Sequence, residues 1–105
     1  MTNITNTAQE AVYLALSTIP SGRVIAYGKL AKLAGLTNGA RQVGRILCNL
    51  PKDSNLPWHR VVNAQGKISL PQDSNSYREQ QQRLTAEGIE IKNGKIKLSI
   101  YGYNN

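Results

Sequence analysis

The chain has 105 residues, a formal net charge of +7, a single Cys and a single His. This length suits one small domain, so residues 1–105 are expected to fold as one unit. One Cys excludes an internal disulfide, one Cys with one His cannot complete an ordinary zinc site, and no apolar run is long enough to span a bilayer. We therefore expect a soluble, cytoplasmic protein that needs no metal, cofactor or membrane partner.

The excess positive charge lies in one central block. Eight of the 13 Lys and Arg residues fall between Arg23 and Lys67, where the only acid is Asp53. The remaining five basic residues are balanced by five acidic ones. A basic face of this kind favours binding to a polyanion such as nucleic acid, although a solvated basic surface without a partner is the simpler alternative.

The first predicted element is an amphipathic helix. Apolar residues from Ala8 to Ile19 recur at intervals of three and four positions. Pro20-Ser21-Gly22 ends this helix, because proline cannot continue it and glycine favours a turn. Arg23–Tyr27 contains Val and Ile and is predicted to be a short extended connector. This part of the chain is expected to be scaffold.

Two short helices are predicted next. The first covers Lys29–Ala34 and is closed by Gly35, and the second begins with Thr37 or Asn38 as its cap and runs to about Asn49. A pair of helices joined by a short turn that contains glycine is typical of the helix-turn-helix motif. The second helix would be the recognition helix.

The outer face of this second helix offers small side chains. Recognition helices that read the major groove usually present Asn, Gln, Arg or Ser to base edges. Here the exposed positions are Gly39, Ala40 and Gly44, with Arg41 and Arg45 beside them. Small residues let a helix approach DNA closely, which suits the narrow minor groove, where arginine can insert. The alternative is that Gly44 serves helix-helix packing.

The segment Pro57-Trp58-His59-Arg60-Val61 holds the only Trp and the only His of the chain. It follows a polar loop and precedes a short strand predicted at Val61-Val62. A core anchor at Trp58 and a hydrogen-bonded histidine at His59 are one interpretation. A functional site is the other, and five residues alone do not decide between them.

The C-terminal third is predicted to be a helix followed by a β-hairpin. Ser76-Tyr-Arg-Glu79 forms a capping box for a helix that Gly88 ends, with a thin apolar face made of Tyr77, Leu84 and Ala86. Residues 89–100 alternate about Asn93-Gly94, which indicates a type I′ hairpin. The expected fold is therefore mainly α with a small β-hairpin, in the form of a winged helix-turn-helix.

The motif at Trp58 resembles the active-site sequence Pro-Cys-His-Arg-Val of the O6-alkylguanine-DNA alkyltransferases, with tryptophan in place of the reactive cysteine. Families with that substitution are the alkyltransferase-like proteins, which bind O6-alkylguanine in DNA without repairing it. The resemblance runs from about residue 8 to the C-terminus. It implies the fold of the DNA-binding domain of those enzymes.

The resemblance also implies roles for single residues. In Gly22–Ala31, Tyr27 matches the tyrosine that rotates the phosphate of the target nucleotide and helps to turn it out of the duplex. In Ala40–Gly44, Arg41 matches the arginine that enters the base stack through the minor groove. Asn49 resembles the asparagine that links the recognition helix to the pocket.

The chemistry of the alkyltransferases implies what this chain lacks. There a histidine held by a glutamate takes the proton of the cysteine through water, and the sulfur attacks the alkyl carbon. His59 matches that histidine and Glu87 matches the glutamate, but Trp58 offers no nucleophile. The lid also differs, because Ser69-Leu-Pro-Gln-Asp-Ser74 replaces the usual loop rich in Gly and Tyr or Ser.

The resemblance thus predicts two sets of residues. The lesion pocket would consist of Tyr27, Asn49, Trp58, His59, Val61 and Glu87, and the DNA contacts would come from Tyr27, Lys29, Gly39, Ala40, Arg41, Gly44 and Arg45. The expected function is non-enzymatic: a monomer flips O6-alkylguanine out of duplex DNA, shields it from alkyltransferase repair and flags it for nucleotide excision repair. The alternatives are alkyl transfer to Cys48 or hydrolysis that uses His59, and a winged helix-turn-helix regulator of undamaged DNA.

Overall fold

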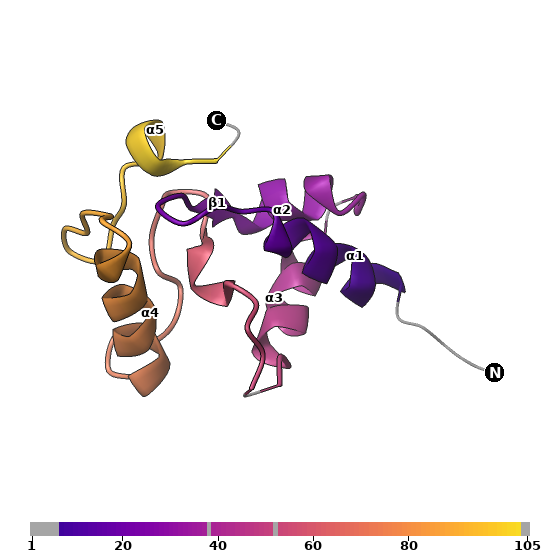
Figure 1. The fold of residues 1–105 in the computed structure, drawn as a ribbon, viewed down its shortest axis with the longest axis horizontal. Helices are drawn as coiled ribbons and strands as arrows, with labels where there is room; N and C mark the ends of the chain where they lie inside the picture. The colour runs from indigo at the N-terminus through magenta and orange to yellow at the C-terminus, as the bar shows by residue number, and fades with distance from the viewer. Residues whose placement is uncertain (1–6, 38, 52, 104–105) are drawn as a thin grey trace.

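The computed structural model describes residues 7–37, 39–51 and 53–103, and it has two helical parts on either side of a short sheet (Figure 1). No helix among these residues is long and apolar enough to cross a membrane. The mainly helical fold with a small β component is confirmed. Its elements are α1 (Thr7–Ser17), β1 (Ile25–Ala26), α2 (Tyr27–Leu33), α3 (Ala40–Cys48), η1 (Trp58–Arg60), β2 (Val61–Val62), α4 (Asn75–Ala86) and α5 (Leu98–Tyr101).

Helices α1, α2 and α3 pack around one hydrophobic cluster. Its fully buried members include Val12 and Leu16 of α1, Leu30 of α2 and Val43 of α3. Val12 and Leu16 lie on the face that the helical spacing of α1 predicts, and α2 and α3 form the expected helix-turn-helix. Burial of several large aliphatic side chains, at about 1.5 to 3 kcal/mol each, holds this half together.

Two boundaries in this half differ from those expected. The connector ends at Ala26, and α2 begins at Tyr27 instead of Lys29. The N-cap of α3 is Gly39, which makes no side-chain capping bond, so Thr37 is not the cap. Asn38, the other expected cap, lies outside the described residues.

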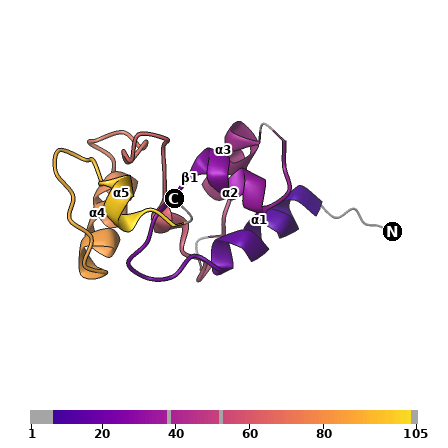
Figure 2. The ribbon, with the colours of Figure 1, turned by 90° about the horizontal axis from the view of Figure 1, so that it is seen from above.

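A two-stranded parallel sheet joins the halves, and Figure 2 shows its first strand, β1, between the helices α1, α2 and α3 on one side and α4 and α5 on the other. Ile25 pairs with Val61 and Ala26 with Val62. Successive side chains of β2 point to opposite sides of the sheet. Val61 therefore belongs to the first hydrophobic cluster and Val62 to a second cluster under α4. The motif that precedes β2 is therefore placed where the two cores meet.

Helix α4 is capped by Ser74 and not by Ser76, since the Ser74 side chain accepts a bond of 3.1 Å from the Tyr77 N–H. The buried stripe of this helix also differs from the expected one. Ala86 is exposed, whereas Gln80 is 3% exposed and takes the inward position between Tyr77 and Leu84.

The hairpin expected over residues 89–100 is wrong except for its turn. Asn93 and Gly94 have φ values of 53° and 72°, and the N–H and C=O of Lys92 pair with those of Lys95, as a type I′ turn requires. After the turn the Ile96 N–H donates to Gly66 O, 2.8 Å away, and the chain forms α5. The inward residues of α5 lie three apart, Leu98 and Tyr101, which suits one helical turn on the second cluster.

Candidate functional site

Helix α4 fixes the backbone of the motif from one side. The side-chain amide of Gln80 donates to His59 O at 3.0 Å and to Val61 O at 2.9 Å. Gln80 is buried, so both carbonyl groups are satisfied away from water. These bonds hold η1, which contains Trp58 and His59, and the start of β2 against α4.

Glu87, the C-cap of α4, is the centre of a hydrogen-bond network around the motif. His59 Nε2 and Arg60 Nη2 each donate to Glu87 Oε2 at 2.7 Å, and the Gly22 N–H donates to Oε1 at 3.0 Å. Arg60 Nη1 donates in turn to Ile19 O at 2.7 Å. The predicted pairing of His59 with Glu87 is thus present, and the network also ties α4 to the end of α1.

The protonation of this pair follows from its surroundings. Burial lowers the pKa of His59 below 6.5, and the hydrogen bond to Glu87 offsets this only in part. Burial alone would raise the pKa of Glu87, but hydrogen bonds from Arg60, His59 and Gly22 outweigh it and hold that pKa at about 2. At neutral pH His59 is therefore uncharged with its proton on Nε2. Its Nδ1 is an unprotonated, buried acceptor that has no partner among the described residues.

Trp58 is half-buried and belongs to neither hydrophobic cluster, so it is not a core anchor. Its ring lies edge-on to that of His59, with centroids 6.2 Å apart and an angle of 89° between the planes. The guanidinium carbon of Arg83 in α4 lies 5.7 Å from the indole centroid. The indole is therefore a neighbour both of the buried histidine and of an exposed cation.

The other predicted pocket residues, Tyr27, Val61 and Asn49, each have different surroundings in the fold. The Tyr27 hydroxyl lies 3.0 Å from Ser69 Oγ, so the first residue of α2 contacts the first residue of the lid segment. Val61 is 1% exposed, and its side chain belongs to the core. Asn49 is the C-cap of α3, and its side-chain amide donates to Arg45 O at 2.9 Å within its own helix. This bond does not link the recognition helix to the motif.

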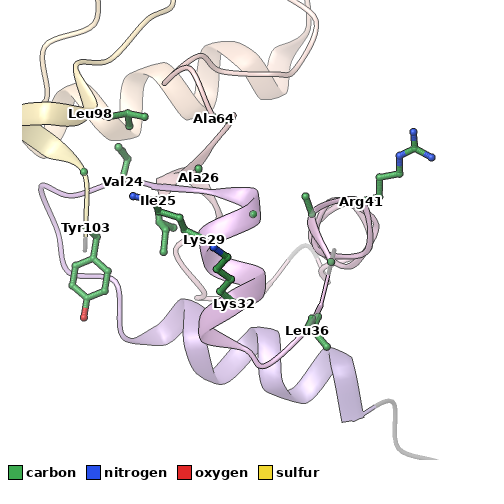
Figure 3. A pocket seen from close by; sticks show the side chains of 14 residues that line it. Val24, Ile25, Ala26, Lys29, Lys32, Leu36, Arg41, Ala64, Leu98 and Tyr103 are labelled. Atoms are coloured by element: carbon green, nitrogen blue, oxygen red, sulfur yellow. The ribbon is translucent and has the colours of Figure 1, made fainter. Parts of the chain in front are cut away.

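A cavity of about 620 Å³ opens between α2, the first turn of α3 and the C-terminal segment (Figure 3). Trp58 does not line it, so it is not the pocket expected beside the motif. Lys29 and Lys32 line it from α2, and Figure 3 shows the Arg41 side chain extending from α3 away from α2. The cavity belongs to the surface where DNA contacts are expected, because its lining includes Lys29, Gly39, Ala40 and Arg41.

The small residues of α3 serve two different purposes. Gly39 is buried, and a Cβ there would lie 2.7 Å from Leu36 Cβ. A glycine is therefore needed for packing at this position, and the expectation that Gly39 is exposed is wrong. A Cβ at Gly44 would meet nothing within 4 Å, which removes the helix-helix packing alternative. Ala40, Arg41 and Arg45 are exposed around it.

Three residues of the site were not assigned a role from the sequence. Gln80 could have been found as a polar residue on the apolar stripe of a helix, i+3 from Tyr77. Arg60 was part of the motif, but its bonds to Glu87 and Ile19 depend on the fold. Nothing in the sequence indicated a role for Arg83, because a single arginine on a polar helix is typical of solvated surface. No group of three or more metal-ligating side chains occurs within 7–37, 39–51 and 53–103.

A helix-turn-helix with arginines beside an open glycine on its second helix, joined to a basic central segment, defines a DNA-binding protein. Residues 7–89 match the model of the 6-O-methylguanine DNA methyltransferase, DNA binding domain, and the chain belongs to this family. The structure bears out the resemblance that the Trp58 motif suggested.

Two relatives and one solved structure are similar to this chain over most of its length. A DNA base-flipping protein of Vibrio parahaemolyticus is 48% identical over 91 residues, which cover 86% of this chain and 89% of the relative. Alkyltransferase-like protein 1 of Schizosaccharomyces pombe is 40% identical over 95 residues, 88% of each chain. The crystal structure of S. pombe Atl1 in complex with damaged DNA containing O6-carboxymethylguanine superimposes with a TM-score of 0.88 at 34% identity, over 98% of this chain and 100% of that one.

Proposed function

We propose that this protein recognises O6-alkylguanine in duplex DNA, turns the damaged base out of the stack and holds it beside Trp58 without transferring the alkyl group. The observation that carries the proposal is the intact pair of His59 and Glu87, 2.7 Å apart, next to an indole where the enzymes of the family have a thiol. The pair of His59 and Glu87 is kept, and the nucleophile is absent.

The same geometry explains why no alkyl transfer is expected. His59 Nδ1 is unprotonated and would be the acceptor for a thiol proton at position 58, but an indole ring offers no activated sulfur. Cys48 is exposed on α3, and neither ring nitrogen of His59 bonds to its thiol, because Nε2 is bonded to Glu87 and Nδ1 has no partner among the described residues. Transfer to Cys48 and hydrolysis through His59 are therefore not favoured.

Recognition without catalysis is energetically reasonable. Turning a base out of the duplex costs a few kcal/mol, and the cost is lower when pairing is already damaged, as it is for O6-alkylguanine. Stacking of a base or an alkyl group on an aromatic ring returns about 1 to 3 kcal/mol. The half-buried indole of Trp58 is placed to supply such a contact, while Arg41 fills the gap in the stack and Tyr27 engages the rotated phosphate.

The relatives support this assignment over an ordinary regulator. One is named for base flipping, and another was crystallised with damaged DNA, whereas a regulator would read undamaged operator sequence. The exposed face of α3, with Ala40 and the open position at Gly44, suits close approach to the minor groove. We further propose that the protein acts as a monomer and that its complex with the lesion shields the base from alkyltransferases and recruits nucleotide excision repair.

Three measurements on one pair of duplexes test the proposal: the binding affinity, the mass of the protein and the state of the base. The oligonucleotides are identical except for guanine or O6-methylguanine at one position, and binding is followed by fluorescence anisotropy. We expect markedly tighter binding to the lesion, an unchanged protein mass and an unchanged base after prolonged incubation. Equal affinity for the two duplexes would remove the lesion-sensor function, and a mass increase of one methyl group on Cys48 would establish an enzyme instead.

A further inference from the structure

Arg83 contacts both the aromatic centre of the site and an acidic neighbour on its own helix. Its guanidinium carbon lies 5.7 Å from the Trp58 ring centroid, and its Nη2 donates to Glu79 Oε2 at 2.7 Å. The side chains of Arg83 and Glu79 are 46% and 50% exposed. The cation therefore lies where the half-buried indole meets solvent, and the ion pair and the ring together restrict its position.

The two arginines near Trp58 differ in how far their charge is neutralised. The side chain of Arg60 is 17% exposed and donates three hydrogen bonds to Glu87, so a carboxylate that is itself only 13% exposed compensates its charge. The carboxylate partner of Arg83 is Glu79, whose side chain is half-exposed to solvent. The positive charge of Arg83 also reaches the motif, since together with Arg60 it lowers the pKa of His59.

We propose that Arg83 determines which O6 substituents the site prefers, and that it favours those that end in a carboxylate. This inference rests on the proposed function, because it places the O6 substituent beside Trp58. A guanidinium has several N–H donors in one plane, and the bond to Glu79 is made through Nη2. The remaining donors can pair with a carboxylate that reaches the outer side of the indole.

The charge dependence follows from the same geometry. A neutral alkyl group gains only apolar contact with the indole, so its binding does not depend on the charge of Arg83. A carboxylate of the same size gains a charge-assisted hydrogen bond as well. Because Arg83 and Glu79 are half-exposed, solvent screens this bond, and the expected preference is about five- to tenfold, not several hundredfold.

The test compares two lesions of nearly equal shape. Dissociation constants are measured at low salt for one duplex carrying O6-carboxymethylguanine, its neutral isostere O6-carbamoylmethylguanine, O6-methylguanine or guanine. The wild-type protein should bind the carboxymethyl lesion about five- to tenfold more tightly than the carbamoylmethyl lesion. Arg83→Gln should reduce that ratio to about one, whereas Arg83→Lys should keep a ratio above about three, because it retains the charge.

Two further variants separate the charge of Arg83 from general effects. Arg78→Gln removes a charge from the same helix at an exposed side chain that bonds to Asn75, and it should leave the ratio unchanged. Glu79→Gln removes the competing carboxylate, so the ratio should rise about two- to threefold. Arg83→Gln is a polar change on an exposed helix face, and its helical circular dichroism is expected to match that of the wild type.

The outcomes distinguish this inference from the function on which it rests. If Arg83→Gln weakens all three lesions equally, Arg83 only supports the indole and the inference is wrong. A wild-type ratio near one with intact preference for O6-methylguanine over guanine would also overturn it, while the lesion-sensor function would stand. Loss of discrimination between every lesion and guanine would overturn both.

Discussion

Glu87 Oε2 and His59 Nε2 lie 2.7 Å apart, although 28 positions separate the two residues in the chain. The same carboxylate accepts hydrogen bonds from Arg60 and from the Gly22 N–H. One side chain thus joins the end of α4, the motif and the turn that follows α1. A network of this kind serves the fold and the site together, because it holds the helix-turn-helix and the indole in fixed relation.

Replacement of Glu87 by Gln should destabilise the protein by about 2 to 3 kcal/mol, because Arg60 loses the charge that compensates its partly buried guanidinium. The free energy of unfolding in urea measures this. Glu90→Gln is the matched control: Glu90 is exposed and lies 3.7 Å from Lys92, so its loss should cost less than about 0.5 kcal/mol. Equal effects of the two substitutions would contradict the central role of Glu87.

Stability should depend on pH in two steps. The pKa of His59 is lower in the folded protein than its ordinary value of 6.5, so the unfolded chain binds this proton more readily. The stability contributed by neutral His59 is complete above about pH 6.5 and is lost as the pH falls through the folded-state pKa. The pKa of Glu87 is lowered from 4.5 to about 2, so a second loss should occur between these values.

Urea midpoints measured from about pH 8 down to about pH 2.5 check both steps. His59→Gln should remove the first step and keep the second, because its side chain does not titrate. Glu87→Gln should remove the second. A midpoint that rises as the pH falls from 7 to 5 would mean that His59 is charged in the folded state.

The helix-turn-helix and the pairing of His59 with Glu87 could be expected from the sequence for different reasons. Helical spacing marked the buried face of α1, Pro20-Ser21-Gly22 marked its end, and Gly35 marked the end of α2. The His59 pair came from family resemblance, because nothing local connects two residues so far apart. Helical spacing places Gln80 on the apolar stripe of α4, three positions after Tyr77, but it does not explain why a polar residue stands there. Only the fold shows that this amide satisfies two carbonyl groups.

The C-terminal segment shows where local patterns fail. Asn93-Gly94 forms the turn that the sequence predicts, because both residues accept positive φ. The strands beside it do not form, because Ile96 pairs with Gly66 and the next residues curl into α5. Alternation over residues 89–100 could not reveal that competing partner. Gly39 is a similar case, since an exposed glycine and one packed against Leu36 look alike in sequence.

Arg41→Ala should weaken binding to O6-methylguanine duplex at least about tenfold, because the gap left by the extruded base goes unfilled and flipping costs a few kcal/mol. Binding to undamaged duplex should fall much less. Lys97→Ala, which removes an exposed charge outside the basic segment, is the control and should reduce both affinities slightly and equally. If Arg41→Ala reduces both affinities by the same factor, Arg41 contacts only the backbone.

Binding should also depend steeply on salt. If the basic residues between Arg23 and Lys67 neutralise about four to six phosphates, a plot of the logarithm of the association constant against the logarithm of the salt concentration should have a slope of roughly −4 to −5. Lys29→Ala should reduce the steepness by about one, because it removes one phosphate contact. Titrations over a range of salt concentrations measure both slopes. A flat dependence would contradict an interface dominated by the DNA backbone.

Gly44→Ala should separate stability from binding. A Cβ at this position meets nothing within 4 Å, and alanine is better than glycine inside a helix by about 1 kcal/mol, so the free energy of unfolding should rise. If α3 approaches the minor groove closely at Gly44, the added methyl group should weaken duplex binding in the same variant. Gly39→Ala is the contrast, because its Cβ would lie 2.7 Å from Leu36 Cβ and 3.1 Å from Ala31 Cβ, which should lower stability. A Gly44→Ala protein that is more stable and binds DNA as well as the wild type would show that the glycine is not required for close approach.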